Sequence, residues 1–188
     1  MSDDAIRTLV RENPGQATYE EYKLVHDVVV ERAPCNLLVF GVGRDSELWL
    51  EANEGGTTVF LEDVQEWADF ARREVPGIRV HDVRYGTLRV FWHLLKHIPE
   101  VFRMEDLPPE VEETPWDVIL VDAPRGTRWY RPGRMKSIYM ASVLGAESGA
   151  DIFVHDCHRR VESEASHRFL GSERMVEQAG SMRHYRLR

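Results

Sequence analysis

The chain has 188 residues, of which 43% are hydrophobic and 30% are charged, and its formal net charge at pH 7 is −8. This length and composition are typical of one globular domain with a hydrophobic core of its own. Proteins that bind nucleic acids through the phosphates present basic surfaces, so the negative charge argues against a nucleic-acid partner. No apolar run approaches the ~20 residues that cross a bilayer, and we expect no membrane partner.

The start of the chain and its cysteines bear on its location. The first residues, Met1-Ser-Asp-Asp4, lack the basic and apolar regions of a signal peptide. Cys35 and Cys157 are too few for a disulfide framework and lack the spacing of a metal motif, although a single bridge between them would fit the count. We therefore expect a cytoplasmic protein with two thiols; the oligomeric state is left open by the sequence.

We predict that residues 1–33 form an N-terminal helical extension and that residues 34–188 form the main domain. Thr18 and Glu21 have the spacing of a capping box, and apolar residues then recur on one helical face until Pro34. Beyond Pro34, apolar strand-like runs alternate with helical segments. We predict strands at residues 37–40, 57–61, 78–83, 116–121 and 151–154, with helices at 45–53, 64–73, 134–147 and 161–170. In the helix at 64–73, Trp67, Phe70 and Ala71 would form the buried face.

Alternating strands and helices predict an α/β fold with a mostly parallel sheet. Two further strands, at about residues 174–178 and 182–187, follow each other without a helix between them and predict a C-terminal antiparallel hairpin. Residues 84–113 fit neither element clearly, because the apolar stretch from Leu88 to His97 is compatible with a strand or a helix.

A glycine turn after the first strand predicts a cofactor site. Gly41 and Gly43 follow the apolar run, and Glu62 ends the next strand 21 residues after Gly41. Glycines let the backbone approach a nucleotide-like ligand, and a carboxylate at this spacing can bind ribose hydroxyls. Ser46 stands where dinucleotide-binding motifs have a third glycine, which disfavours NAD and leaves S-adenosylmethionine (SAM) open. A tight turn without a ligand is the alternative.

Polar residues also end the later strands, where an α/β sheet binds ligands. We take Asp82 as a further cofactor contact, and Asp122, His155 and Asp156 as catalytic candidates, with His158 as an alternative base or acceptor contact. Asp122 and Asp156 would repel each other in one cleft unless a cation or a proton lay between them. A divalent metal ion held by these two carboxylates is one interpretation; a helix cap and a loop hydrogen bond are the other.

A basic loop follows Asp122. It contains Arg125, Arg128, Arg131 and Arg134 together with Trp129 and Tyr130. Guanidinium groups bind carboxylates with two hydrogen bonds, and aromatic rings pack on sugars. The acceptor would then be an acidic, sugar-like molecule, contacted by Arg125, Tyr130 and Arg134 of this loop and by Arg159. Arg134, with Arg125 in support, would hold its carboxylate. A solvated basic loop that pairs with the acidic surface of the protein is the alternative.

Six motifs of this chain occur together, and in this order, in a known family. They are Asn36-Leu-Leu-Val-Phe-Gly-Val-Gly-Arg-Asp-Ser46, Phe60-Leu-Glu62, Tyr85-Gly-Thr87, Trp116-Asp-Val-Ile-Leu-Val-Asp-Ala-Pro124, Pro132-Gly-Arg-Met135 and Val154-His-Asp156. The chain from about residue 34 onward resembles the glucuronoxylan 4-O-methyltransferase family, which contains the plant polysaccharide-biosynthesis domain related to the irregular-xylem proteins.

The resemblance implies a Rossmann-like SAM-dependent O-methyltransferase that acts on the 4-hydroxyl of a glucuronic acid unit. It implies cofactor contacts at Gly41, Gly43 and Glu62, and acceptor binding or catalysis by Asp122, Arg134, His155 and Asp156. Plant members carry an N-terminal Golgi anchor that is not seen in this chain, and residues 125, 157 and 158 differ from theirs. The acceptor could therefore be another acidic glycan or small molecule.

Two other functions remain open from the sequence. One is an NAD-dependent oxidoreductase, which the missing third glycine and the terminal hairpin disfavour. The other is a non-catalytic SAM- or glycan-binding module of the same fold, which the two strand-end carboxylates disfavour.

Overall fold

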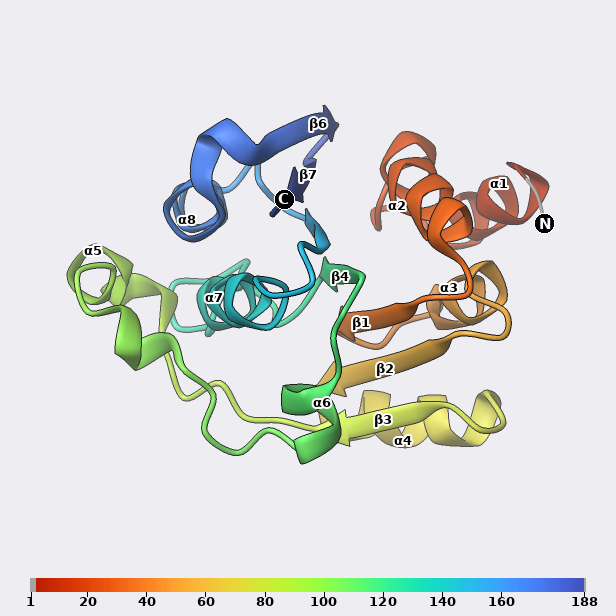
Figure 1. The fold of residues 1–188 in the computed structure, drawn as a ribbon, viewed down its shortest axis with the longest axis horizontal. Coiled ribbons are helices and arrows are strands. Elements are labelled where there is room, and N and C mark those ends of the chain that lie inside the picture. Colours follow the sequence, from red (N-terminus) through yellow and green to blue (C-terminus); the bar gives the residue numbers. More distant parts are fainter. Residues whose placement is uncertain (1–2, 188) are drawn as a thin grey trace.

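The computed structural model describes residues 3–187, so Met1, Ser2 and Arg188, at the ends of the two predicted segments, lie outside the described residues. A seven-stranded sheet of order β3-β2-β1-β4-β5-β7-β6 forms the centre of the molecule (Figure 1). Its parallel strands are β1 (Asn36–Phe40), β2 (Thr57–Glu62), β3 (Arg79–Asp82), β4 (Val118–Val121) and β5 (Asp151–Val154). The hairpin of β6 (Met175–Ala179) and β7 (Met182–Arg186) adds two antiparallel strands, β7 against β5. The predicted α/β fold with a C-terminal hairpin is confirmed.

Alternate residues of the strands feed two hydrophobic cores, one on each face of the sheet. Leu37 and Val39 of β1 face α1 (Asp3–Glu12), α2 (Tyr19–Arg32) and α3 (Ser46–Ala52). Leu38 and Phe40 face the other core, which includes residues of α5 (Trp92–Leu95), α6 (Pro109–Glu113), α7 (Met135–Leu144) and α8 (Arg160–Ser166). The predicted helical extension therefore shares a core with the main domain.

The capping box predicted at the start of α2 is present. Glu21 N–H donates to Thr18 Oγ1, and Thr18 N–H donates to the Glu21 carboxylate. Pro34 follows the end of α2, as expected. The capping contact also fixes Glu21 in a buried position, only 3% exposed.

Helix α4 (Gln65–Glu74) differs from the prediction in its buried face. We expected Trp67, Phe70 and Ala71 to be buried, but the buried residues are Ala68 and Ala71. Trp67 and Phe70 are partly exposed and pack edge to face, with ring centroids 5.8 Å apart. The buried face of the helix is thus shifted by one residue from the predicted one, and the Trp67 side chain lies toward a pocket.

The ambiguous segment 84–113 forms only short helices. A 3-10 turn at Arg89–Phe91 leads into α5, another 3-10 turn covers Pro99–Phe102, and α6 follows. Trp92 and Phe102 enter the core, whereas Phe91, Leu94 and Ile98 are about half exposed. Among the described residues, no helix is long and apolar enough to cross a membrane. Cys35 and Cys157 are both buried free thiols.

Candidate active site

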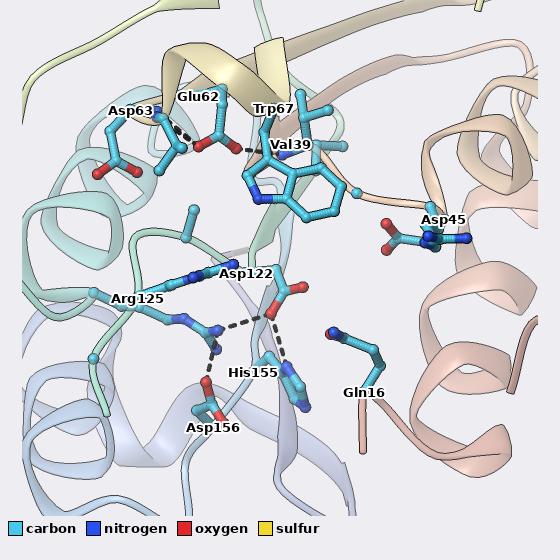
Figure 2. Close-up of a pocket in the computed structure, with 18 of the residues that line it drawn as sticks. Gln16, Val39, Asp45, Glu62, Asp63, Trp67, Asp122, Arg125, His155 and Asp156 are labelled. Carbon is cyan, nitrogen blue, oxygen red and sulfur yellow. Dashed lines mark hydrogen bonds and ion pairs between the residues drawn. The ribbon is translucent and has the colours of Figure 1, made fainter. Parts of the chain in front are cut away.

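A pocket of about 450 Å³ lies at the carboxyl ends of β1, β2, β4 and β5 (Figure 2). This is where open α/β sheets bind ligands, and the volume is in the range of small-molecule sites. The loop between α1 and α2 supplies Asn13, Gly15 and Gln16 to the lining, so the N-terminal segment takes part in the site. Of the predicted site residues, the lining contains Gly41, Gly43, Glu62, Asp122, Arg125, Arg134, His155, Asp156 and Arg159.

Gly41 allows the first strand to turn tightly into the pocket. Its φ is +117°, a conformation that disfavours any side chain, and a Cβ there would lie 3.0 Å from the Cβ of Ala123. The Gly41 N–H donates to the carbonyl of Leu61, which ties the turn to β2. The predicted glycine turn is thus packed between the ends of β2 and β4.

Glu62 holds the glycine turn as well as facing the pocket. One carboxylate oxygen accepts the N–H of Val42 at 2.8 Å, and the other accepts those of Asp63 and Val64. Burial raises the pKa of Glu62, and these backbone donors oppose the increase. The oxygen that faces Val42 accepts one donor only and has capacity for a hydroxyl.

Trp67 is a pocket residue that the sequence pattern assigned to the core. It lies beside Glu62 and Val39 in Figure 2. A partly exposed indole next to a carboxylate that can bind ribose offers a flat surface to a purine ring. The apolar periodicity of α4 predicted that Trp67 is buried and gave no indication that it lines a pocket.

Four of the predicted site residues lie outside the pocket lining. Ser46 is 1% exposed, and its hydroxyl accepts the N–H of Gly43, so it stabilises the turn instead of facing a ligand. Asp82 pairs with Arg72 at 3.1 Å on the far side of β2, because β3 is the edge strand. Tyr130 lies at the tip of its loop with Arg128 and Arg131 beside its ring, and the His158 side chain is 61% exposed. The geometry therefore gives no support for ligand contacts by these four residues.

Arg134 joins the two carboxylates that end β4 and β5. One of its terminal nitrogens lies 2.9 Å from Asp122 Oδ1 and 2.6 Å from Asp156 Oδ2. Arg159 lies 2.7 Å from the same Asp156 oxygen. Asp156 has a φ of +64°, an uncommon conformation that its surroundings must stabilise. The repulsion expected between Asp122 and Asp156 is thus relieved by a guanidinium group.

This arrangement bears directly on the predicted metal ion. Asp122, His155 and Asp156 have one ligand atom each within 4.8 Å of one another. However, hydrogen-bond donors of His155, Arg134 and Arg159 already occupy the Asp122 and Asp156 oxygens that face each other. A divalent ion would have to displace Arg134, whose side chain is 6% exposed. The residues present therefore do not fit a metal centre.

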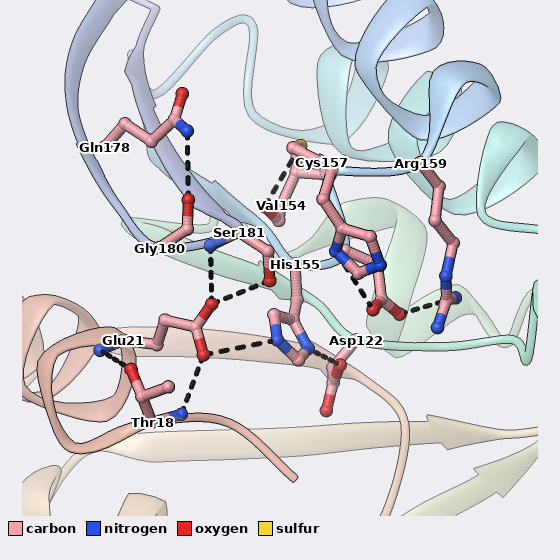
Figure 3. Close-up of polar contacts among 12 residues, drawn as sticks. Thr18, Glu21, Asp122, Val154, His155, Cys157, Arg159, Gln178, Gly180 and Ser181 are labelled. Carbon is pink, nitrogen blue, oxygen red and sulfur yellow. Dashed lines mark hydrogen bonds and ion pairs between the residues drawn. The ribbon is translucent and has the colours of Figure 1, made fainter. Parts of the chain in front are cut away.

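His155 lies between two carboxylates (Figure 3). Its Nδ1 is 2.7 Å from Asp122 Oδ1, and its Nε2 is 3.7 Å from Glu21. Burial opposes the charged ring, but the hydrogen bond to Asp122 and the nearby carboxylate of Glu21 outweigh it and raise the pKa of His155 to about 9. His155 is therefore an imidazolium at neutral pH. The cationic neighbours Arg134 and His155 outweigh burial at Asp122 and lower its pKa, so Asp122 is ionised.

Glu21 belongs to the site although sequence analysis gave it only a capping role. Its carboxylate accepts the N–H of Thr18 as well as the N–H and the hydroxyl of Ser181, in the turn between β6 and β7. Burial raises the pKa of Glu21, but these donors and His155 together bring it well below its usual range. No local signal could have found this contact, since Ser181 is 160 positions away in the chain.

Glu162 is a second carboxylate missed by sequence analysis. It is fully buried beneath the basic loop, 3.7 Å from Arg89, and a Cβ on Gly126 would lie 2.5 Å from its Oε1. Burial raises the pKa of Glu162. Its packing requires glycine at position 126 and so shapes the loop that carries Arg125.

Arg125 differs from Arg134 in its availability. Within residues 3–187 it forms no ion pair, its side chain is exposed, and it lines the pocket. The Nε and one terminal nitrogen of Arg134 also lack partners, but they are shielded from solvent. We expected Arg134 to bind the acceptor carboxylate; the structure places it between Asp122 and Asp156 and leaves Arg125 facing the pocket.

The fold and the site together define a class of protein. A parallel sheet extended by an antiparallel hairpin, with a glycine turn after β1 and an acidic residue ending β2, is the arrangement of Rossmann-like SAM-dependent methyltransferases. The chain belongs to the IRX15/IRX15L/GXM family, whose model matches residues 20–101 and 99–185.

Relatives with curated names agree with this family. The chain is 35% identical to glucuronoxylan 4-O-methyltransferase 2 of Arabidopsis thaliana, in an alignment that covers all of this chain and 71% of the relative. It is also 35% identical to arabinogalactan O-methyltransferase 2 of the same plant, covering 92% and 67% of the two chains. A solved methyltransferase-like protein from Silicibacter pomeroyi is 16% identical, with coverages of 86% and 83% and a TM-score of 0.46, too low to support inferences about function.

Proposed function

We propose that this protein transfers the methyl group of SAM to a hydroxyl, with the 4-hydroxyl as first candidate, of a glucuronic-acid-type unit in a polysaccharide. Family membership and relatives named for O-methylation of glucuronoxylan and arabinogalactan support the reaction and the acceptor class. The observation that carries the proposal is Asp122, an ionised carboxylate with 36% of its side chain exposed, in the same pocket lining as Glu62 and Arg125.

Asp122 is the group we propose to receive the proton of the acceptor hydroxyl. SAM, held at Glu62 and the glycine turn, would supply an electrophilic methyl group for in-line transfer to the hydroxyl oxygen, and its sulfur would leave as the thioether of S-adenosylhomocysteine. Asp122 Oδ1 already bonds Arg134 and His155, so its other oxygen is free to orient the hydroxyl and take the proton. Positioning of this kind supplies much of the rate in such a transfer.

Neither histidine fits the role of base as well. His155 is protonated at neutral pH because Asp122 and Glu21 flank it, and a base must be free to accept a proton. His158 does not belong to the pocket lining, and 61% of its side chain is exposed to solvent. In this proposal His155 fixes Asp122 and stabilises its charge.

Arg134 takes the place of a metal ion in the proposed mechanism. Its guanidinium bridges Asp122 and Asp156 and offsets the repulsion between the two carboxylates, which lets them lie close together. Methyl transfer would therefore persist in the presence of a chelator.

Arg125 is the residue we propose to bind the carboxylate of the acceptor. Arg125 forms no ion pair among the described residues, and it lines the pocket together with Thr127. Arg159 would contribute a second positive charge, although it already pairs with Asp156.

The test is methyl transfer from isotope-labelled SAM to glucuronoxylan from which methyl groups are absent. Carboxyl-reduced glucuronoxylan is the matched control, because it keeps the backbone and loses the charge. We expect label in the acidic polymer, at the 4-position of the glucuronic acid, and at least tenfold less in the reduced polymer. Equal labelling of both would contradict the acidic acceptor, and labelling of neither, with NAD bound in place of S-adenosylhomocysteine in calorimetry, would favour the oxidoreductase alternative.

A further inference from the structure

Asp45 is a carboxylate of the pocket lining, and neither the fold nor the proposed proton transfer accounts for its position there. It occupies the residue before α3, where an aspartate ordinarily accepts a hydrogen bond from the first helical N–H groups. Here the side chain makes no such capping bond. Its Oδ2 instead accepts the indole N–H of Trp49 at 2.9 Å, which fixes the carboxylate at the pocket wall.

The other oxygen of Asp45 has space and no partner. A Cβ on Gly43 would lie 2.6 Å from Asp45 Oδ1, so the second glycine of the turn leaves room for this oxygen. Asp122 and Asp156 each pair with arginine, whereas Asp45 forms no ion pair within the described part of the chain. A charge fixed in this way is available for a cation from outside the chain.

The arrangement of the pocket identifies that cation. In Figure 2, Glu62 lies at one end, Asp45 and Gln16 lie at the other, and Asp122 lies between them. SAM has the same order of groups: adenosine, then the sulfonium with its methyl group, then the amino-acid tail. If SAM bound with its ribose at Glu62 and its methyl group toward Asp122, its tail would extend toward the end of the pocket that holds Asp45.

We propose that Asp45 binds the α-ammonium group of SAM through Oδ1. Glycine at position 43 leaves this oxygen uncovered, because a Cβ there would lie 2.6 Å from it. The inference rests on SAM as the cofactor of the proposed function. It is supported by the pKa of Asp45, which burial and then the charge of Asp122 raise to about 6 despite the bond from Trp49. A bound ammonium group would offset the cost of an ionised carboxylate at this position.

The test compares two ligands in titration calorimetry: S-adenosylhomocysteine and its analogue without the amino group. The wild type should bind the analogue about 10- to 100-fold more weakly, as expected for the loss of a charged hydrogen bond. Asp45→Asn, which keeps an acceptor for Trp49, should bind both ligands with the weaker affinity. Asp63→Asn, another pocket carboxylate at the Glu62 end, should leave the wild-type difference intact.

The pH dependence gives a second readout that needs no variant. As pH falls through about 6, Asp45 becomes protonated, so S-adenosylhomocysteine should bind more weakly while the amino-free analogue is unaffected. Asp122, Asp156, Arg134 and His155 face the same pocket, but they are paired among themselves and affect both ligands alike. His155, with a pKa of about 9, stays charged as pH falls through 6, and Tyr22, whose pKa burial raises, stays neutral.

Equal affinity of the wild type for the two ligands, or an unchanged difference in Asp45→Asn, would overturn the inference and leave the proposed function standing. Failure of the wild type to bind S-adenosylhomocysteine at all would overturn both. If Asp45→Asn does not fold, the comparison of ligands and pH values on the wild type decides the question.

Discussion

Asp122 is surrounded by two fixed cations, and its exposed oxygen faces the pocket. Replacing it by asparagine keeps the size of the side chain and removes the proton acceptor. We expect Asp122→Asn to lower kcat by about 10²- to 10⁴-fold, the usual contribution of a general base. Its affinity for S-adenosylhomocysteine should change little, because Glu62 and the glycine turn are intact. Steady-state kinetics and calorimetry measure the two quantities; full activity in the variant would assign the proton to another group.

Arg125 should decide the preference for acidic acceptors. Arg125→Ala removes the exposed guanidinium without disturbing an ion pair of the described residues. We expect its KM for a glucuronate-bearing oligosaccharide to rise about 10- to 100-fold, as for a lost charged hydrogen bond, and its KM for the methyl ester to change little. Arg128→Ala is the matched control, since this arginine belongs to the same loop but lies outside the lining. An equal rise for both acceptors would contradict the assignment.

At the scale of secondary-structure elements, α2 connects the hairpin to His155. The Glu21 carboxylate accepts hydrogen bonds from the start of its own helix and from the β6–β7 turn, and it also lies 3.7 Å from the imidazole ring of His155 (Figure 3). Glu21→Ala leaves these donors buried without an acceptor, and we expect it to lower the free energy of unfolding by about 2 kcal/mol. Glu20→Ala, at the exposed neighbouring position, should change it by less than about 0.5 kcal/mol. Chemical denaturation measures both.

The same variant has an electrostatic consequence at His155. The folded-state pKa of about 9 exceeds the ordinary 6.5, so His155 contributes stability that is full below pH 6.5 and is lost as pH rises through 9. Without Glu21 the pKa should fall toward 6.5, and the loss of stability should move to lower pH. An NMR titration of His155 in the wild type and the variant checks this; an unchanged pKa would mean that Asp122 alone sets the charge of the ring.

Segment 84–113 shows where local patterns failed. Its apolar residues are spaced for either a strand or a helix, and the structure contains only short helical turns in which Phe91, Leu94 and Ile98 remain about half exposed. Hydrogen bonds from Arg89 and Val90 to the carbonyls of Arg131 and Trp129 hold the start of this segment. Those partners lie some 40 positions away, so short-range periodicity carries no information about them.

For the whole molecule, a buried ion cluster joins both ends of the chain to the sheet. Asp151 of β5 pairs with Arg32 at the end of α2, and it accepts hydrogen bonds from His184 and Arg186 of β7, each at 2.7 Å. Burial opposes the charge of Asp151, but His184, Arg186 and Arg32 outweigh it and lower its pKa to about 2. One carboxylate thus holds α2 and the hairpin to β5.

This cluster predicts how stability depends on acid. The contribution of Asp151 is full above its ordinary pKa of 3.8 and is lost as pH falls toward 2. We expect Asp151→Asn to lower the free energy of unfolding at pH 7 by about 3 kcal/mol and to flatten its decline between pH 4 and 2. Asp27→Asn, a carboxylate in an exposed pair with Lys23, is the control and should change stability by less than about 0.5 kcal/mol. Urea denaturation at several pH values measures both.

The sequence by itself determined the order of strands and helices, the glycine turn and the set of polar residues at the strand ends. These follow from short-range periodicity and from the shared edge of parallel strands, which places Glu62, Asp122 and Asp156 at one end of the sheet. Only the tertiary structure decided how these groups are paired. In the folded chain Arg134 lies where a metal ion was considered. Trp67 and Asp45 line the pocket, and Glu21 lies next to His155. Ion pairs and burial depend on distances of a few ångströms between segments far apart in the chain, and residue patterns do not specify such distances.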